Sequence, residues 1–156
     1  MEYRGTLSSG QEWAQNGKLE EWVHAYLLSD GHNKPFSDGL KITERIFTGP
    51  VSMPLSLFQR CCGPEEHMTY RVDQSWWEKN VQALQHAIQT GSDLPPLIIH
   101  YILSEGKDNG EFELNDGNKR WEAYTRLGIE KSSVIFWFTE RREHEHFRAL
   151  YGQYLI

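Results

Sequence analysis

Two apolar runs constrain the fold more than any other part of this chain: LIIHYIL at residues 97–103 and SVIFWFT at residues 133–139. Runs of this length and composition are typical of buried strands, and β-branched and aromatic residues dominate the second. The turn formers at residues 106–110 are followed by a short strand at 111–115. We therefore predict a hairpin formed by the first run and this short strand, together with a separate strand at 133–139.

Helical periodicity surrounds these strands. Apolar residues recur on one face at residues 18–28 and again at 74–90, where Asp73 is a suitable N-cap. Residues 117–127 form a third such segment, which ends before Gly128. A closing helix is predicted at residues 143–154.

The remaining segments are less regular. Residues 31–54 are rich in turn formers, with a short helical turn expected at 40–47. Apolar residues alternate at 51–60, which predicts a strand that Pro54 would place at a sheet edge. Residues 61–70 are expected to form a loop.

This order of elements predicts an α+β fold with a small mixed sheet and flanking helices. At 156 residues the chain is most simply one compact unit. Within it we expect an N-terminal helical extension, residues 1–50, packed on a core domain formed by residues 51–156.

Composition excludes several classes of protein. A net charge of −6 argues against a dedicated DNA-binding module, although Lys119, Arg120 and Arg126 could form a local basic patch. The N-terminus does not resemble a signal peptide, and no run is apolar enough to span a membrane. The adjacent Cys61 and Cys62 cannot close an ordinary disulfide loop, so we expect two buried thiols in a reduced, cytoplasmic setting.

Histidines and tryptophans carry weaker signals. His144 and His146 would lie on opposite sides of a helix, so no metal site is assigned to them. Trp76, Trp77 and Trp137 are expected in the core, although any one of them could stack on a base.

A candidate anion site lies between the predicted strand at 111–115 and the helix that follows. The sequence there is Asp116-Gly117-Asn118-Lys119-Arg120. Gly117 would let the backbone approach a phosphate, and the N–H groups of Asn118 and Lys119 would point at its oxygens. Arg120 could hold the phosphate bidentately. The alternative is a structural cap, in which Asp116 is the N-cap and the two cations are only solvated.

Several segments together resemble the ParB/sulfiredoxin superfamily. They are Pro95-Pro96-Leu97-Ile98-Ile99, the DGNKRWEAYTRLGI stretch and SVIFWF, and the resemblance covers residues 51–139. The motif is similar to the Gly-Glu-Arg-Arg form of ParB and to the Asp-Gly-His-His-Arg form of free serine kinases. The resemblance implies a bound nucleoside triphosphate, ATP or CTP, with Mg²⁺. It also implies a possible NTPase or small-molecule phosphotransferase activity.

The resemblance extends the candidate site to the preceding loop. A Glu in the corresponding loop of the serine kinases acts as the base, which points to Glu66 before Glu65, or to these carboxylates as holders of Mg²⁺. Arg60 occupies a place that helps hold nucleotide phosphates in ParB. The alternatives are a solvated acidic loop and a surface arginine.

Two departures narrow the function. Asn118 stands where sulfiredoxins place a reactive cysteine, and an amide cannot replace a thiolate. The chain ends soon after its last predicted strand, so we expect no helix-turn-helix domain of the ParB type. Besides nucleotide or phosphorylated small-molecule binding, two readings stay open: a nucleic-acid-binding or nuclease-type module, and a non-catalytic domain that lost its nucleotide. The oligomeric state and any catalytic activity are not assigned.

Overall fold

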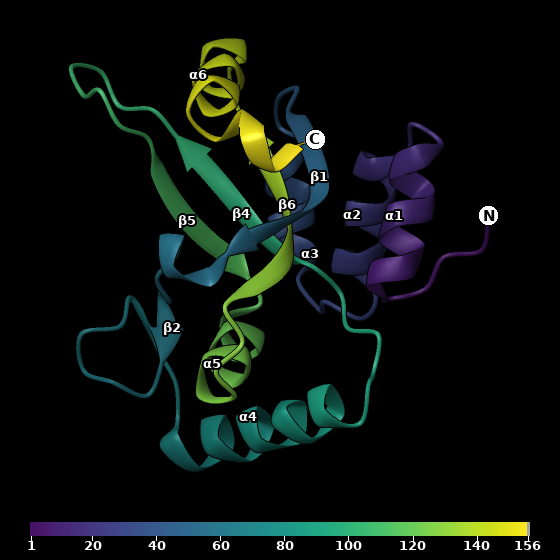
Figure 1. Cartoon of the computed structure of the whole chain (residues 1–156), viewed down its shortest axis with the longest axis vertical. Helices are drawn as coiled ribbons and strands as arrows, with labels where there is room; N and C mark the ends of the chain where they lie inside the picture. Colours follow the sequence, from purple (N-terminus) through teal and green to yellow (C-terminus); the bar gives the residue numbers. More distant parts are fainter. Residues whose placement is uncertain (156) are drawn as a thin grey trace.

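The computed structural model describes residues 1–155 and is built around a mixed four-stranded sheet (Figure 1). Its strands are β1 (Ile46–Pro54), β4 (Leu97–Ile102), β5 (Glu111–Asp116) and β6 (Lys131–Phe138). Their order in the sheet is β1-β6-β4-β5. The central strands β4 and β6 are parallel, and each edge strand is antiparallel to its neighbour. The α+β fold with a small mixed sheet is thus confirmed.

Helices cover both faces and one end of this sheet. They are α1 (Leu7–Gln15), α2 (Leu19–Leu28), α3 (Lys34–Leu40), α4 (Gln74–Gln89), α5 (Asn118–Arg126) and α6 (Arg141–Tyr151). Figure 1 shows α1 and α2 on one side of the sheet, α6 near the β4–β5 hairpin, and α4 alongside α5 at the opposite end. Single 3₁₀ turns follow β1 and α6, namely η1 (Leu55–Leu57) and η2 (Gly152–Leu155).

The alternating side chains of the central strands build two cores, one on each face of the sheet. Leu97, Ile99 and Tyr101 of β4 share a buried cluster with Phe147 of α6. Ile98, which points to the other face, packs with residues of α2 and α3. Since both faces are covered, β4 is apolar except at His100, and β6 is apolar from Val134 to Phe138, as the sequence runs predicted.

A third, smaller cluster joins α4 to α5. It consists of Trp77, Val81 and Ala123. Asp73 begins α4 as predicted, because its carboxylate accepts a hydrogen bond from the backbone N–H of Trp76 at 2.9 Å. The cluster around Trp77 holds α4 against α5.

The N-terminal third of the chain differs most from the sequence prediction. Helix α1 was not predicted, and the helical turn expected at residues 40–47 is wrong. The helix in that region is α3, which begins earlier: the Asn33 side chain accepts from the Phe36 N–H, and Pro35 lies in the first turn. An Asn cap followed by Pro favours a helix start even where the segment is too short to show periodicity.

Three further boundaries are corrected. The predicted strand at 51–60 is instead β1, which begins at Ile46, ends at Pro54 and does lie at a sheet edge. The loop expected at 61–70 is bracketed by a two-residue parallel pair, β2 (Cys62–Gly63) and β3 (Tyr70–Arg71). The closing helix begins at Arg141, two residues before the predicted start, and turns into η2 at Gly152. In the part of the chain described, no helix has the length and apolar character that crossing a membrane requires.

Glu143 offers a test of how α6 is attached to the sheet. This buried carboxylate accepts from the backbone N–H groups of Leu103 at 2.9 Å, Thr139 at 3.2 Å and Glu140 at 3.1 Å. We expect Glu143→Ala to lower the free energy of unfolding by about 2 kcal/mol, because three partly buried donors lose their acceptor. Chemical denaturation would measure the change. Glu145→Ala, an exposed position on the same helix, is the control and should have little effect; equal effects of the two variants would contradict the assignment.

Candidate anion-binding site

Gly117 forms the junction between β5 and α5. It is the N-cap residue of α5 and has a left-handed backbone conformation with φ 103°. A Cβ at this position would overlap the side chain of Leu97. Only glycine therefore combines this backbone angle with the close approach of β4.

The alternative in which Asp116 is the N-cap of this helix is wrong, because Gly117 holds that position. Asp116 is the last residue of β5, and its carboxylate accepts hydrogen bonds from the Tyr26 hydroxyl at 2.8 Å and from Arg120 Nη2 at 2.9 Å. The pleat of β5 turns this side chain toward α2, away from the first-turn N–H groups. Within residues 1–155 no side chain caps α5, which leaves these N–H groups without an intrahelical partner.

Arg120 is buried at the centre of this junction. Its Nη1 donates to the Tyr26 hydroxyl at 3.3 Å, and its Nη2 donates to the carbonyl of Pro96 at 3.1 Å as well as to Asp116. Burial opposes the positive charge, but the oxygens of Tyr26 and Asp116 outweigh it and raise the pKa of Arg120. The Nε atom is buried and has no hydrogen-bond partner among the described residues.

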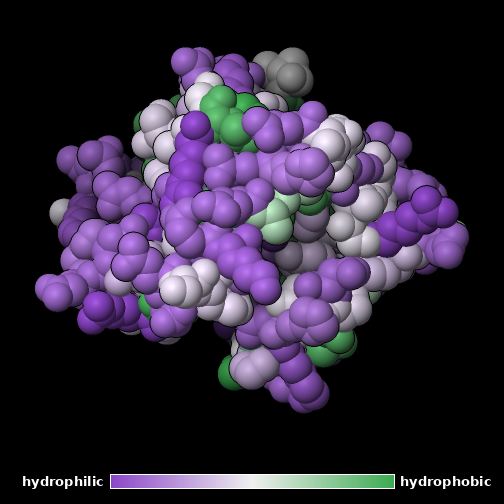
Figure 2. Space-filling view, turned by 90° about the horizontal axis from the view of Figure 1, so that it is seen from below, coloured by the Kyte–Doolittle hydropathy of each residue, from purple (hydrophilic) through white to green (hydrophobic). Residues whose placement is uncertain are grey.

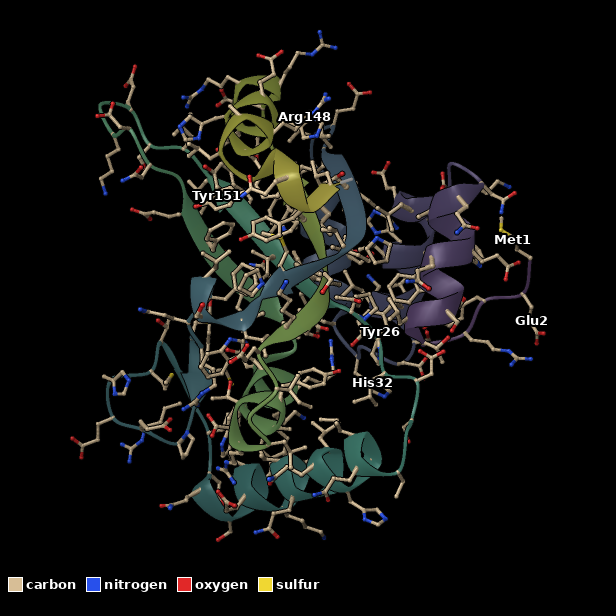
Figure 3. The ribbon with its side chains drawn as sticks, viewed as in Figure 1. Met1, Glu2, Tyr26, His32, Arg148 and Tyr151 are labelled. Atoms are coloured by element: carbon tan, nitrogen blue, oxygen red, sulfur yellow. The ribbon has the colours of Figure 1, made fainter. Side chains whose placement is uncertain are left out.

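The motif borders a cavity of about 610 Å³, called here the motif cavity. Asp116 to Arg120 form one wall, α4 forms the second, and the end of α2 with the turn after it forms the third. Figure 3 shows Tyr26 and His32 between the α1–α2 pair and the α4–α5 pair. Figure 2 views the α4 end of the molecule, which is largely hydrophilic and is hollowed near its middle.

Lys119 is the cation of the motif that faces this cavity. It has no ion pair with any of the described residues, and its Nζ lies 4.6 Å from the centre of the Trp76 ring. Trp77 and Trp137 are buried as expected, whereas Trp76 is 47% exposed and the prediction of a core residue is wrong for it. Trp76 is the third residue of α4 and stays partly exposed, whereas its neighbour Trp77 fills the contact with α5.

Asn118 connects the motif to the segment at Cys61 and Cys62. Its Oδ1 accepts from the backbone N–H of Cys61 at 2.9 Å and of Cys62 at 3.2 Å, and its Nδ2 donates to the Leu114 carbonyl at 3.3 Å. Both thiols are free and half-buried, where fully buried thiols were expected. Burial raises the pKa of both, and for Cys62 the nearby Lys119 and Arg60 partly offset it.

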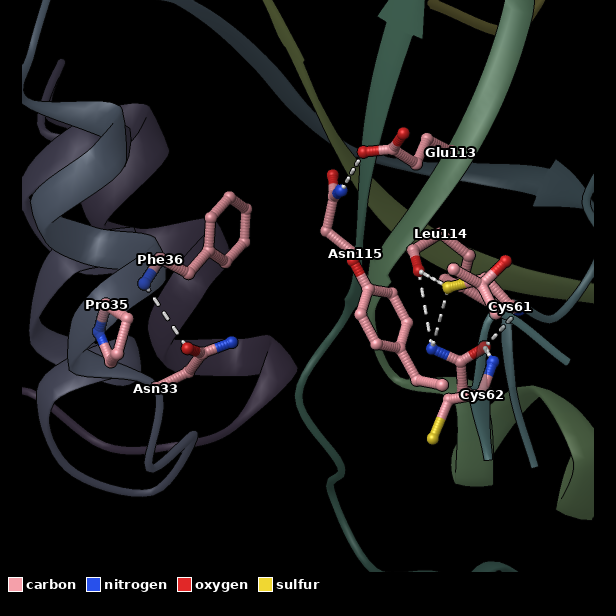
Figure 4. A pocket seen from close by; sticks show the side chains of 11 residues that line it. Asn33, Pro35, Phe36, Cys61, Cys62, Glu113, Leu114 and Asn115 are labelled. Carbon is pink, nitrogen blue, oxygen red and sulfur yellow. Dashed lines mark hydrogen bonds between the residues drawn. The ribbon is translucent and has the colours of Figure 1, made fainter. Parts of the chain in front are cut away.

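A second cavity of about 600 Å³ adjoins the first and shares Asn115 and Asn118 with it. Figure 4 shows Asn33, Pro35 and Phe36 on its α3 side, facing Glu113, Asn115 and the two cysteines. The two cavities therefore meet at the end of β5 and the start of α5.

The loop residues predicted for this site lie apart from it. Arg60 pairs with Glu65 at 2.6 Å and with Glu122 at 3.1 Å, and its guanidinium lies 4.9 Å from the Trp77 ring centre. The hydrogen bonds from Arg60 lower the pKa of Glu65. Glu66 is exposed. None of the three lines the motif cavity, so the structure brings Asp116 to Arg120 together but leaves these loop side chains outside.

Sequence reasoning missed the third wall of the cavity. Tyr26 comes from α2, and Asp30 and His32 come from the turn after it; Asn80 of α4 was missed as well. The one local signal was the amphipathic face of residues 18–28, which marked Tyr26 as buried but could not show that its hydroxyl meets Asp116. No three His, Cys, Asp or Glu side chains between residues 1 and 155 gather closely enough to hold a metal ion.

The fold and the site define an α+β domain in which a strand–glycine–helix junction opens on a cavity beside a buried arginine. The chain belongs to the ParB N-terminal domain family, whose model matches residues 66–149, more than half of the sequence. The predicted ParB-like membership is confirmed.

Among solved structures, the chain is similar to the C-terminally truncated chromosome-partitioning protein ParB from Caulobacter crescentus, complexed with CTP-gamma-S. The two are 18% identical with a TM-score of 0.43, and the similarity covers 67% of this chain and 54% of that one. This chain therefore spans about half the length of that structure. No curated protein matches it.

Two glycines allow the close approach at the motif to be measured. Gly117 and Gly128 both have positive φ, but a Cβ at Gly128 would meet nothing within 4 Å. We expect Gly117→Ala to destabilise the fold by about 3 kcal/mol and Gly128→Ala by about 1 kcal/mol, because only the first adds an overlap to the backbone strain. Thermal and denaturant unfolding would give both values. Equal losses would show that the contact with Leu97 does not constrain the junction.

Proposed function

We propose that this chain binds a nucleotide or a related phosphorylated ligand in the motif cavity, with the phosphate at the start of α5. The observation that carries the proposal is the uncapped first turn of α5 beside two cations, Lys119 and the buried Arg120. Unpaired N–H groups and the helix dipole favour an anion at such a position. The unsatisfied Nε of Arg120 adds a buried donor at the same junction.

The two cations have different parts in this proposal. Lys119 is the direct phosphate contact, since it is half-buried and free to leave the Trp76 ring for a stronger, charge-assisted hydrogen bond. Arg120 is already held by Asp116, Tyr26 and Pro96, so it orients the junction while its charge is balanced by the carboxylate of Asp116. Gly117 and the N–H groups of Asn118 and Lys119 form the rest of the proposed phosphate-binding site.

The size of the cavity supports a ligand larger than inorganic phosphate. At about 610 Å³ it falls within the range of typical small-molecule sites. The chain carries an overall charge of −6, so a favourable field for an anion has to arise locally, from Lys119 and the N-terminal start of α5. ATP and CTP are the ligands to test first.

In this proposal Mg²⁺ binds together with the nucleotide phosphates. Because the described residues offer no cluster of acidic and histidine ligands for a metal ion, the phosphate oxygens would supply most of its coordination. A Mg²⁺ ion bound in this way would offset the charge of a triphosphate.

Hydrolysis or transfer of a phosphoryl group is the narrower part of the proposal. Glu66 is the better candidate base, because its exposed carboxylate is without an ion pair in the described structure, whereas Glu65 is bound to Arg60. Arg60 acts in this scheme by holding Glu65 and Glu122 in place. If Glu66 is the base, Glu66→Gln should abolish phosphate release while nucleotide still binds.

Binding can be tested by isothermal titration calorimetry with ATP, CTP and ADP in the presence of Mg²⁺. We expect saturable heat for at least one of them and a loss of affinity of about ten-fold or more in Lys119→Gln, because one charge-assisted contact to phosphate is removed. Lys79→Gln changes an exposed lysine of α4 that does not line the cavity, and it should leave the affinity unchanged.

Two results would contradict the proposal. One is the absence of heat with all three nucleotides. The other is binding that Lys119→Gln does not weaken relative to Lys79→Gln, since this would place the phosphate elsewhere.

A further inference from the structure

The indole of Trp76 is the unusual feature of the motif cavity. At 47% exposure it is one of the few large apolar side chains left open to solvent, although the next residue, Trp77, is 1% exposed. Exposing half of an indole forgoes much of the stabilisation that its burial would give. Its position on the wall of a cavity calls for a functional explanation.

The other tyrosine and tryptophan rings of the cavity are already engaged. Tyr26 is stacked on Trp22, with ring centres 5.3 Å apart and planes 6° from parallel. Trp77 packs in the contact between α4 and α5 and lies beneath the Arg60 guanidinium. Trp76 is covered only by Lys119 among the described contacts to its ring. It is therefore the ring with a face available to a ligand.

Lys119, which lies over the Trp76 ring, is also the residue that contacts the phosphate in the proposed function. Lys119 is the second residue of α5, so its backbone N–H belongs to the same helix start that would receive the phosphate. An ammonium group over an exposed ring is held more weakly than one bonded to a phosphate oxygen. When Lys119 turns to a phosphate, it uncovers the indole at a place next to that phosphate.

We infer that Trp76 is the platform on which the base of a nucleotide stacks, while its phosphates occupy the start of α5. The ligand class is then a nucleotide with a planar base, and a phosphorylated ligand without an aromatic group would bind more weakly. This inference rests on the proposed function. Stacking on a tryptophan does not depend on which base the nucleotide carries, because every base has a π-face.

The test separates the base from the phosphates. Calorimetry would compare ATP and CTP with inorganic tripolyphosphate, each with Mg²⁺, on the full chain and on Trp76→Ala and Trp76→Phe. We expect Trp76→Ala to weaken binding of the nucleotides about ten-fold and to change tripolyphosphate affinity less than two-fold. Trp76→Phe should recover most of the loss, because a phenyl ring still stacks.

Tyr70 provides the matched control. It is 64% exposed and lines the second cavity, not the motif cavity. Tyr70→Ala should leave all affinities unchanged. If Tyr70→Ala weakens nucleotide binding selectively while Trp76→Ala does not, the base lies in the second cavity and the inference is overturned.

A spectroscopic measurement on the unaltered chain covers the case in which Trp76→Ala does not fold. The indole N–H resonance of Trp76, assigned by its loss in Trp76→Phe, should move upfield when nucleotide is added and stay in place with tripolyphosphate. An unmoved resonance at saturating nucleotide would overturn the inference. If neither the nucleotides nor tripolyphosphate bind, the proposed function itself fails. If both bind and Trp76→Ala lowers both affinities equally, or lowers neither, only the role of Trp76 as a base platform fails.

Discussion

The buried ion pair between Arg120 and Asp116 is the interaction on which the arrangement of the site depends. An isolated guanidinium in this position would be very costly, because burial removes its hydration. The carboxylate of Asp116, the hydroxyl of Tyr26 and the carbonyl of Pro96 together restore that loss. These groups belong to β5, α2 and the segment entering β4, so a single side chain from α5 joins three parts of the chain that are distant in sequence.

Asn118 makes a second connection of the same kind on the other side of α5. Its carbonyl oxygen accepts from two consecutive backbone N–H groups at Cys61 and Cys62, and its amide nitrogen donates to Leu114. Its side chain is thus fully engaged in the framework. The amide fixes the distance between the start of α5 and the segment that holds Arg60.

The sequence predicted the parts of the fold that local burial determines. The runs at residues 97–103 and 133–139 are buried on both faces, and the helix at 74–90 has a strong cap and an apolar face, so each could be located from its own residues. Helix α3 has seven residues and too little periodicity for that. The sequence offered Asp116 as part of the phosphate site or as a helix cap, and only the register of β5 shows that its carboxylate points to Tyr26 of α2. Trp76 lines the cavity because its neighbour Trp77 is the one that packs against α5. The sequence does not show which of two adjacent tryptophans takes that place.

The motif cavity is divided between two sections of the chain. The family match begins at residue 66 and includes the motif and α4. Tyr26, Asp30 and His32 lie outside that match, yet they close the cavity on its third side. The motif therefore lies within the segment that the family model matches, whereas the third side of the cavity is formed by residues that precede that segment. Replacing the N-terminal segment would therefore change the shape of the cavity without altering the residues of the motif.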